Sequence, residues 1–270
     1  MDYKLPELPI RDENSNKGTF GKILNISGSE YMSGAAYLSS ISALKVGAGY
    51  VELASDERVL NAVATLASEV VLAPLNKISE IDATVLLIGC GLSTSEKAKN
   101  IFKKSIETHP NIPTVIDADG LNILSQTNLK LNKNVILTPH PKEASRLLGC
   151  TLEEILNNME KSAKKISEKY NCITVLKSHK TLVTDGKKIY HNTTGNSALA
   201  KAGSGDILAG MIAGLLAQKM NSFDAAALGV YLHGLAGDLA KNDLTAYGVL
   251  ASDTIRYIPY AIKNHLCKKV

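Results

Sequence analysis

Short apolar segments alternate with longer helical patterns along most of this chain, and this alternation limits the folds that it can adopt. The apolar segments are rich in β-branched residues, and several lack the alternation of apolar and polar residues that marks a half-exposed strand. The predicted strands are residues 22–26, 50–54, 70–72, 84–88, 114–116, 134–137 and 173–176. The helical patterns between and after them are residues 34–46, 57–68, 94–107, 142–148 and 152–170. Together they predict an α/β fold in which helices cover both faces of a mainly parallel central sheet.

The pattern changes in the last third of the chain. Residues 181–184 and 188–191 flank Asp185 and Gly186, a pair that strongly favours a two-residue hairpin turn. We therefore expect a short antiparallel hairpin, and then helices at residues 206–218, at 222–241 and from residue 252. No segment has the composition of an interdomain linker, and no internal repeat is present, so we expect one domain over residues 1–270.

Charge and hydropathy exclude several kinds of partner. The 270 residues include 30 Lys and Arg against 26 Asp and Glu, a net charge of +4 that gives no electrostatic basis for binding nucleic acid. The longest apolar stretch, residues 207–217, is too short for a bilayer span, and the N-terminus lacks a signal-peptide pattern. The four cysteines have neither CxxC nor metal-ligand spacing, as in proteins of reducing compartments. We expect a cytoplasmic protein without a membrane partner.

Several common nucleotide and hydrolase motifs are incomplete in this chain. It lacks the G-x-x-x-x-G-K-[ST] phosphate loop, and the glycine pairs at residues 47–49 and 89–91 lack the third glycine of a dinucleotide fingerprint. Residues 195–197 begin like a nucleophile elbow, but Leu199 stands where that motif needs glycine. The sequence therefore lacks the main motif that would support either a Rossmann dehydrogenase or an α/β-hydrolase.

A glycine-rich loop is the strongest candidate for a phosphate site. Gly203, Ser204, Gly205 and Asp206 precede an apolar helical stretch, so we expect the loop at the N-terminus of a buried helix. Free N–H groups and the helix dipole attract anions there. Asp206 is either an N-terminal cap or a base beside bound phosphate, and in the second role the surrounding N–H groups would keep it ionised.

Three further polar clusters follow predicted strands. His140 lies between two prolines in a strand-to-helix turn, at the sheet edge where α/β folds bind ligands. Asp117 and Asp119 could hold a metal or a hydroxyl group, or could cap the next helix. Lys177 could meet a phosphate as a point charge, or could belong to a polar connecting turn.

The order of these clusters resembles that of the ADP/ATP-dependent NAD(P)H-hydrate dehydratases. The resemblance rests on KGTFGKILNISGSEYMSGAAYLS, IGCGL, DADGLNIL, LTPHPKEASRLLG, VLKSHKTLV and NTTGNSALAKAGSGDILAGMIAG, and it extends from about Lys17 to about Tyr257. The chain is similar to the stand-alone bacterial type, because no residues are left for the epimerase domain that many bacterial relatives carry in front.

This resemblance implies a ribokinase-like fold and the repair of damaged nicotinamide cofactors. The family acts on NADHX and NADPHX, whose nicotinamide ring has gained water at C6. It phosphorylates the hydroxyl of the S-epimer with ADP, or in some members ATP, in the presence of Mg²⁺. Phosphate then leaves, NADH or NADPH is restored, and ADP yields AMP. The family also implies a homotetramer.

The resemblance further implies roles for individual residues. Asp206 corresponds to the catalytic base and also contacts the hydrate. The positions that correspond to nucleotide binding are Lys177, Ser178, His179, Lys180, Thr181, Gly203, Ser204 and Gly205. Ala35, Gly91 and His140 correspond to the hydrate pocket. Asn122 and Glu143 resemble more distant polar contacts to phosphate, metal or its waters, and no metal ligand is assigned.

Two positions depart from the family pattern, and two other functions stay open. Ser204 replaces threonine and keeps the hydroxyl, whereas Ser178 replaces a glycine that lets the backbone approach the nucleotide. A ribokinase-fold small-molecule kinase of the hydroxyethylthiazole or hydroxymethylpyrimidine type would share the glycine-rich loop. A nucleotide-binding regulator without activity would not need the base at Asp206.

Overall fold

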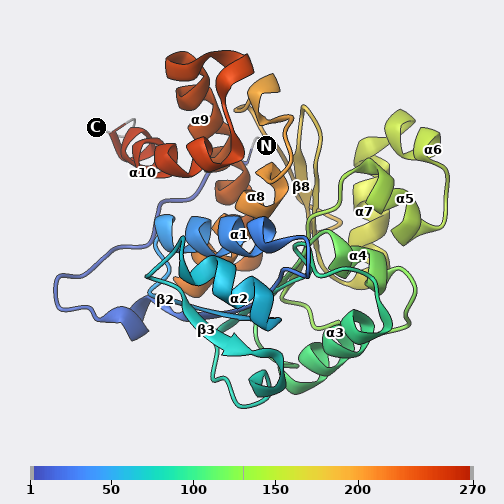
Figure 1. Ribbon diagram of the computed structural model, residues 1–270. Coiled ribbons are helices and arrows are strands. Elements are labelled where there is room, and N and C mark those ends of the chain that lie inside the picture. The colour runs from blue at the N-terminus through green and yellow to red at the C-terminus, as the bar shows by residue number, and fades with distance from the viewer. Residues whose placement is uncertain (1–2, 130, 268–270) are drawn as a thin grey trace.

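Nine strands form the central sheet of the computed structural model, which describes residues 3–129 and 131–267 (Figure 1). The strands are β1 (Lys22–Ile26), β2 (Tyr50–Ser55), β3 (Val71–Pro74), β4 (Val85–Ile88), β5 (Thr114–Ile116), β6 (Val135–Leu137), β7 (Ile173–Leu176), β8 (Leu182–Thr184) and β9 (Ile189–His191). Their order in the sheet is β3-β2-β1-β4-β5-β6-β7-β8-β9. Pairings from β3 to β7 are parallel, and β8 pairs antiparallel with both β7 and β9.

Helices connect the parallel strands and continue after the last strand. They are α1 (Ser33–Lys45), α2 (Glu57–Ala64), α3 (Glu96–Thr108), α4 (Asp119–Leu124), α5 (Pro141–Leu148), α6 (Leu152–Asn157), α7 (Met159–Tyr170), α8 (Ser204–Ala217), α9 (Ser222–Gly248) and α10 (Ala251–Cys267). Three short 3-10 helices are η1 (Lys17–Phe20), η2 (Leu75–Lys77) and η3 (Ser197–Leu199). Within the described ranges, no helix combines the length and apolarity that crossing a membrane requires.

The helices form two layers, one on each face of the sheet. The helices α1, α2, α8, α9 and α10 share one apolar core with the sheet, and α3, α4, α5, α6 and α7 share the other (Figure 1). Alternate strand residues enter different cores: Ile23 and Leu87 face α1 and α8, whereas Leu24 and Ile88 face the opposite layer. Coverage of both faces explains why these strands are continuous apolar runs in the sequence.

The expected strands and helices are present, with ends shifted by a few residues, and three details differ from the prediction. The helix predicted over residues 152–170 is interrupted at Asn158 (φ −145°, ψ 54°), which separates α6 from α7. The expected two-residue hairpin turn is a longer loop over residues 185–188, in which Asp185 Oδ1 accepts two backbone hydrogen bonds. The short helix α4 is additional, because the sequence indicates only a possible cap at its start.

The strand order reverses between β1 and β4, which pair although β2 and β3 lie between them in the sequence. In open α/β sheets, ligands bind outside the carboxyl ends of the strands near such a reversal. The chain leaves this edge of the sheet at Gly89 after β4, Asp117 after β5, Thr138 after β6 and Lys177 after β7. The fold therefore brings the polar clusters, each of which follows a predicted strand, together at one edge of the sheet.

Candidate active site

A cavity of about 960 Å³ lies where α8 begins beside the carboxyl ends of β5, β6 and β7. The loop between β9 and α8 and part of α9 form its other walls. The implicated residues that line it are His140, Glu143, Lys177, Ser178, His179, Thr181, Gly203, Ser204, Gly205 and Asp206. Most of the residues that the family resemblance indicates therefore share one cavity.

The helix α8 begins at the glycine-rich loop, as the sequence predicts. Gly203 precedes the helix with φ 94° and ψ −19°, a left-handed conformation that disfavours a side chain. A Cβ at this position would also lie 2.5 Å from Leu38 Cδ1. No side chain of the described residues caps α8. The Ser204 N–H donates to the Lys201 carbonyl oxygen and the Ile207 N–H to the Gly203 carbonyl oxygen, which leaves the N–H groups of Gly205 and Asp206 and the helix dipole for an anion in the cavity.

Asp206 lies in the first turn of α8 and lines the cavity without capping the helix. Burial, and then the charge of Asp117, raise the pKa of its carboxyl from 3.8 to about 6. Burial and the second carboxylate act against the ionised form that is expected from the sequence, but a carboxyl with a pKa of about 6 is still mostly ionised at pH 7. A carboxyl with a pKa near neutral pH is well suited to accept a proton during a reaction.

Asp117 and Lys177 form an ion pair beside this loop, in which Asp117 is buried and Lys177 is partly exposed. Lys177 Nζ lies 2.6 Å from Asp117 Oδ1, which also accepts a hydrogen bond of 2.7 Å from Thr138 Oγ1. Burial opposes the lysine charge, but Asp117 and Glu143 hold the pKa of Lys177 above its ordinary value. A Cβ added to Gly205 would lie 3.2 Å from Lys177 Nζ, so the cation sits directly behind the anion-binding loop. The sequence did not indicate this pairing.

His140 and Glu143 form a reciprocal cap at the start of α5. His140 Nδ1 accepts hydrogen bonds from the N–H groups of Lys142 and Glu143, and Glu143 Oε2 accepts one from the His140 N–H. The ring proton is therefore on Nε2, 3.2 Å from Glu143 Oε1. Burial and the Lys177 charge lower the pKa of His140, whereas burial raises the pKa of Glu143 to about 7. The imidazole is neutral at pH 7.

Four of the implicated residues are not among those lining this cavity. Ala35 and Gly91 are adjacent, since a Cβ added to Gly91 would lie 2.9 Å from Ala35 Cβ. Asn122 bridges two neighbours: its Oδ1 accepts a hydrogen bond of 2.7 Å from Arg146, and its Nδ2 donates to Asp119. Lys180 is exposed.

Two residues of α9 belong to the site although no sequence motif marks them. The Asp238 carboxylate accepts hydrogen bonds from the Gly195 N–H (2.9 Å) and the Asn196 side chain (2.7 Å), which fixes the loop that walls the cavity. His233 lines the cavity, burial lowers its pKa to about 4, and its buried Nε2 has no hydrogen-bond partner among the described residues. Their only signal in the sequence is polarity within a mostly apolar helical stretch.

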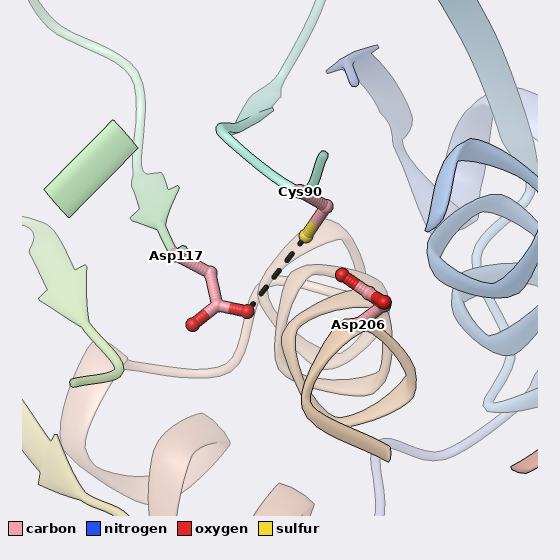
Figure 2. A group of neighbouring side chains, drawn as sticks. All are labelled: Cys90, Asp117 and Asp206. Atoms are coloured by element: carbon pink, nitrogen blue, oxygen red, sulfur yellow. Dashed lines mark hydrogen bonds between the residues drawn. The ribbon is translucent and has the colours of Figure 1, made fainter. Parts of the chain in front are cut away.

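Three potential metal ligands meet at the ends of β4 and β5 and the start of α8 (Figure 2). Cys90 Sγ and carboxylate oxygens of Asp117 and Asp206 all lie within 4.8 Å of one another. Burial and the two carboxylates raise the pKa of the Cys90 thiol well above its usual value. Sulfur does not suit Mg²⁺, which takes oxygen ligands.

The Glu143 carboxylate fits Mg²⁺ better than this cluster. In phosphoryl-transfer sites, Mg²⁺ binds through one or two carboxylates together with the phosphates of the substrate. Glu143 lines the cavity on α5, and both of its oxygens are oriented by His140. It offers the oxygen donor that a metal carried by nucleotide phosphates needs.

Comparisons with known proteins give sequence relatives over nearly the whole chain. The family profile for NAD(P)H-hydrate dehydratase matches residues 23–260. The ADP-dependent (S)-NAD(P)H-hydrate dehydratase of Neisseria meningitidis serogroup B is 40% identical over 252 residues, which cover 90% of this chain and 85% of that protein. The bifunctional NAD(P)H-hydrate repair enzyme of Moorella thermoacetica is 36% identical over 280 residues, which cover 96% of this chain and 52% of that enzyme. The chain spans about half the length of this bifunctional relative.

A solved structure agrees with these relatives. The ADP/ATP-dependent NAD(P)H-hydrate dehydratase of Bacillus subtilis, co-crystallised with ATP and Mg²⁺, has a TM-score of 0.86 to this structure and 30% sequence identity. The match covers 96% of this chain and 94% of that chain. The α/β fold with a mainly parallel sheet and an antiparallel edge is thus the fold of that enzyme.

Proposed function

The chain belongs to the NAD(P)H-hydrate dehydratase family, and on this premise we propose that it is a hydro-lyase that restores NADH and NADPH from NADHX and NADPHX. It transfers a phosphoryl group from ADP to the C6 hydroxyl of the S-epimer, and then releases phosphate and AMP. The observation that carries this proposal is Asp206, a cavity-lining carboxyl with a pKa of about 6 at the N-terminus of α8.

Asp206 is the base of the proposed reaction. It accepts the proton of the C6 hydroxyl as that oxygen attacks phosphorus, a contribution of about 10²- to 10⁴-fold to the rate. The N–H groups at the start of α8 stabilise negative charge on the transferred group, and Lys177 adds a cation behind Gly205. Departure of phosphate needs little more assistance, because phosphate is a far better leaving group than hydroxide and the ring nitrogen donates electrons.

We assign the nucleotide to the wall formed by residues 177–181 and the glycine-rich loop. The residues of the first segment that line the cavity are Lys177, Ser178, His179 and Thr181. The Ser178 Oγ accepts a hydrogen bond of 3.0 Å from the Lys180 N–H, so this side chain turns back into its own loop. The Thr181 hydroxyl accepts from the Ser178 N–H and donates to the Ser178 carbonyl oxygen, so the serine closes this turn on itself, and we propose that the nucleotide contacts its outer surface.

We assign the nicotinamide ring of the hydrate to the space between Asp206 and His140. The neutral imidazole of His140 suits an uncharged ring, because burial and Lys177 keep its pKa low. Ala35 and Gly91 complete this pocket in the proposal. Both residues are buried and pack against each other, so in this assignment they would shape the pocket from behind the residues that line the cavity.

The metal of the proposed reaction is Mg²⁺, which neutralises charge on the nucleotide phosphates when bound. Glu143 would hold it directly or through its waters. Arg146 is one of the charges that act on Glu143, and Asn122 fixes the position of Arg146 with a hydrogen bond of 2.7 Å. Asn122 thus acts on the metal site through Arg146.

The assembly and location are part of the same proposal. We propose a homotetramer, supported by apolar side chains exposed on α9 and α10, among them Tyr247 (94% exposed) and Tyr260 (60%). Four free thiols support a reducing compartment, the cytoplasm. The sheet that joins β3 to β9 supports one domain over residues 1–270, of which residues 1, 2, 130 and 268–270 lie outside the described part.

The test is the return of dihydronicotinamide absorbance from purified NADHX, measured with ADP, with ATP and with neither. We expect recovery only with a nucleotide, with one phosphate released per NADH formed. Asp206→Asn should bind ADP as the wild type does and lose at least about 100-fold in turnover. A phosphorylated product that persists would instead identify a small-molecule kinase with this fold, and ADP binding without any turnover would identify a regulator.

A further inference from the structure

The turn after β4 carries a thiol that the proposed reaction does not use. Cys90 stands between Gly89 (φ 118°) and Gly91 (φ 61°), which both have backbone conformations that disfavour a side chain. A Cβ at Gly89 would lie 2.1 Å from the Asp117 carbonyl oxygen, and one at Gly91 would lie 2.8 Å from Met32 Cβ. The turn is held between the end of β5 and the start of α1, which fixes where the Cys90 side chain lies.

The thiol lies beside two carboxylates that come from other elements (Figure 2). Cys90 Sγ is 3.8 Å from Asp117 Oδ2, and an oxygen of Asp206 completes a set of donor atoms within 4.8 Å. Lys177 engages the other oxygen of Asp117, so Oδ2 is left on the side of the thiol. Asp206 and Asp117 also line the cavity, which gives an ion a path to these donors.

The donor set matches the geometry of a zinc site. Zn–S bonds of about 2.3 Å and Zn–O bonds of about 2.1 Å at a tetrahedral angle place sulfur and oxygen about 3.6 Å apart, close to the 3.8 Å between Cys90 Sγ and Asp117 Oδ2. Three protein ligands leave the fourth position for water, as in open zinc sites. Mg²⁺ demands six oxygen ligands and gives up its waters reluctantly, so the sulfur selects against it.

The charges also favour a divalent cation. Before a cation binds, the Cys90 thiol keeps its proton and Lys177 compensates the charge of Asp117, so the ionised Asp206 carboxylate is the negative charge of this cluster that has no compensating cation within it. A bound divalent cation would stabilise this carboxylate together with the thiolate that forms on binding.

We propose that Cys90, Asp117 and Asp206 form a binding site for Zn²⁺ or a similar borderline divalent cation, distinct from the site of the nucleotide-bound Mg²⁺, and that its occupation inhibits the enzyme. On binding, the S–H bond of Cys90 breaks, a metal–sulfur bond forms, and the proton passes to solvent. Inhibition follows because the cation takes the Asp206 oxygen that accepts the hydroxyl proton. This second part rests on the proposed function, whereas binding does not.

The binding test uses Co²⁺ alone, as a coloured substitute for Zn²⁺, in full-length protein without substrate. The background is Cys150→Ser/Cys267→Ser, which removes the two thiols that are not buried. We expect one Co²⁺ per chain with a thiolate-to-cobalt charge-transfer band that Zn²⁺ abolishes and excess Mg²⁺ does not. Cys90→Ser should remove the band, and Asp206→Asn should weaken Co²⁺ binding at least about tenfold. Cys172→Ser, which removes the other buried thiol, is the matched control and should change neither.

The inhibition test adds Zn²⁺ to the dehydratase assay, with Mg²⁺ and ADP held constant. Zn²⁺ should inhibit reversibly, and Cys90→Ser should raise the half-inhibiting concentration at least about tenfold. A folded background protein without the cobalt band, or a band that survives Cys90→Ser, would overturn the site. Equal inhibition of the Cys90→Ser and Cys172→Ser proteins would overturn the regulatory role. Lack of dehydratase activity before zinc is added would count against the proposed function alone, since cobalt binding needs no substrate.

Discussion

Replacement of Asp206 by asparagine is expected to stabilise the fold above pH 6 while it removes the proposed base. The pKa of this carboxyl is raised from 3.8 to about 6, chiefly by burial and then by the charge of Asp117. A carboxyl whose pKa is higher in the folded than in the unfolded chain stabilises the fold at low pH, and that stabilisation is lost as pH rises through about 6. The difference corresponds to about 3 kcal/mol in the free energy of unfolding, as an upper limit for a side chain that is not completely buried.

Urea unfolding at pH 8 and at pH 5 measures this effect. At pH 8 the wild-type protein holds an ionised carboxylate beside Asp117, whereas Asp206→Asn holds a neutral amide of nearly the same size. The variant should be more stable by about 2 to 3 kcal/mol at pH 8, and the gain should shrink at pH 5, where most of the wild-type carboxyl is protonated. Asp82→Asn, at an exposed aspartate, should stay within about 0.5 kcal/mol of wild type. Equal or lower stability of Asp206→Asn at pH 8 would refute the argument that burial beside Asp117 raises this pKa.

Three further predictions concern activity and stability. Turnover should rise with pH through about 6, because the base Asp206 must be ionised. Asp117→Asn should move this rise to lower pH, and an unshifted pH–rate profile would show that Asp117 does not raise the pKa of Asp206. His140→Ala should lower the free energy of unfolding by about 1 kcal/mol in thermal unfolding, because α5 loses its N-terminal cap, and should raise the KM for NADHX. An unchanged KM would mean that His140 caps α5 and does not contact the hydrate. Gly203→Ala should weaken ADP binding about tenfold or more in calorimetry. The control is Gly149→Ala, at a glycine that is also left-handed but has open space around it, and it should affect only stability. Equal ADP affinities of the two variants would contradict the role of the Gly203 backbone in binding the nucleotide.

Much of the fold is predictable from local patterns, because burial on both faces of a parallel sheet makes each strand a continuous apolar run. The details that differ depend on single residues. The pattern of residues 152–170 keeps its helical periodicity through Asn158, so it cannot show that the backbone leaves the helix there. Thr151 and Glu154 do form a capping box at the start of α6, which the sequence could have revealed. It would have located one helix start without showing the break.

In the candidate site, too, features encoded in one short segment are predictable from the sequence, whereas features that depend on distant segments are not. Asp206 is predictable because glycines, the helix start and the carboxylate are consecutive in the chain, so one short segment contains the whole signal. Its raised pKa is not predictable from that segment, because Asp117 reaches it from the end of β5. Cys90 is missed for the same reason, since it has no ligand spacing in the sequence. Yet Cys90 and Asp117 end neighbouring parallel strands, β4 and β5, and residues that follow such strands meet at one edge of the sheet. Knowledge of the strand order alone would therefore predict the thiol–carboxylate pair, whereas Asp206 joins it only because the loop before α8 crosses back over that edge.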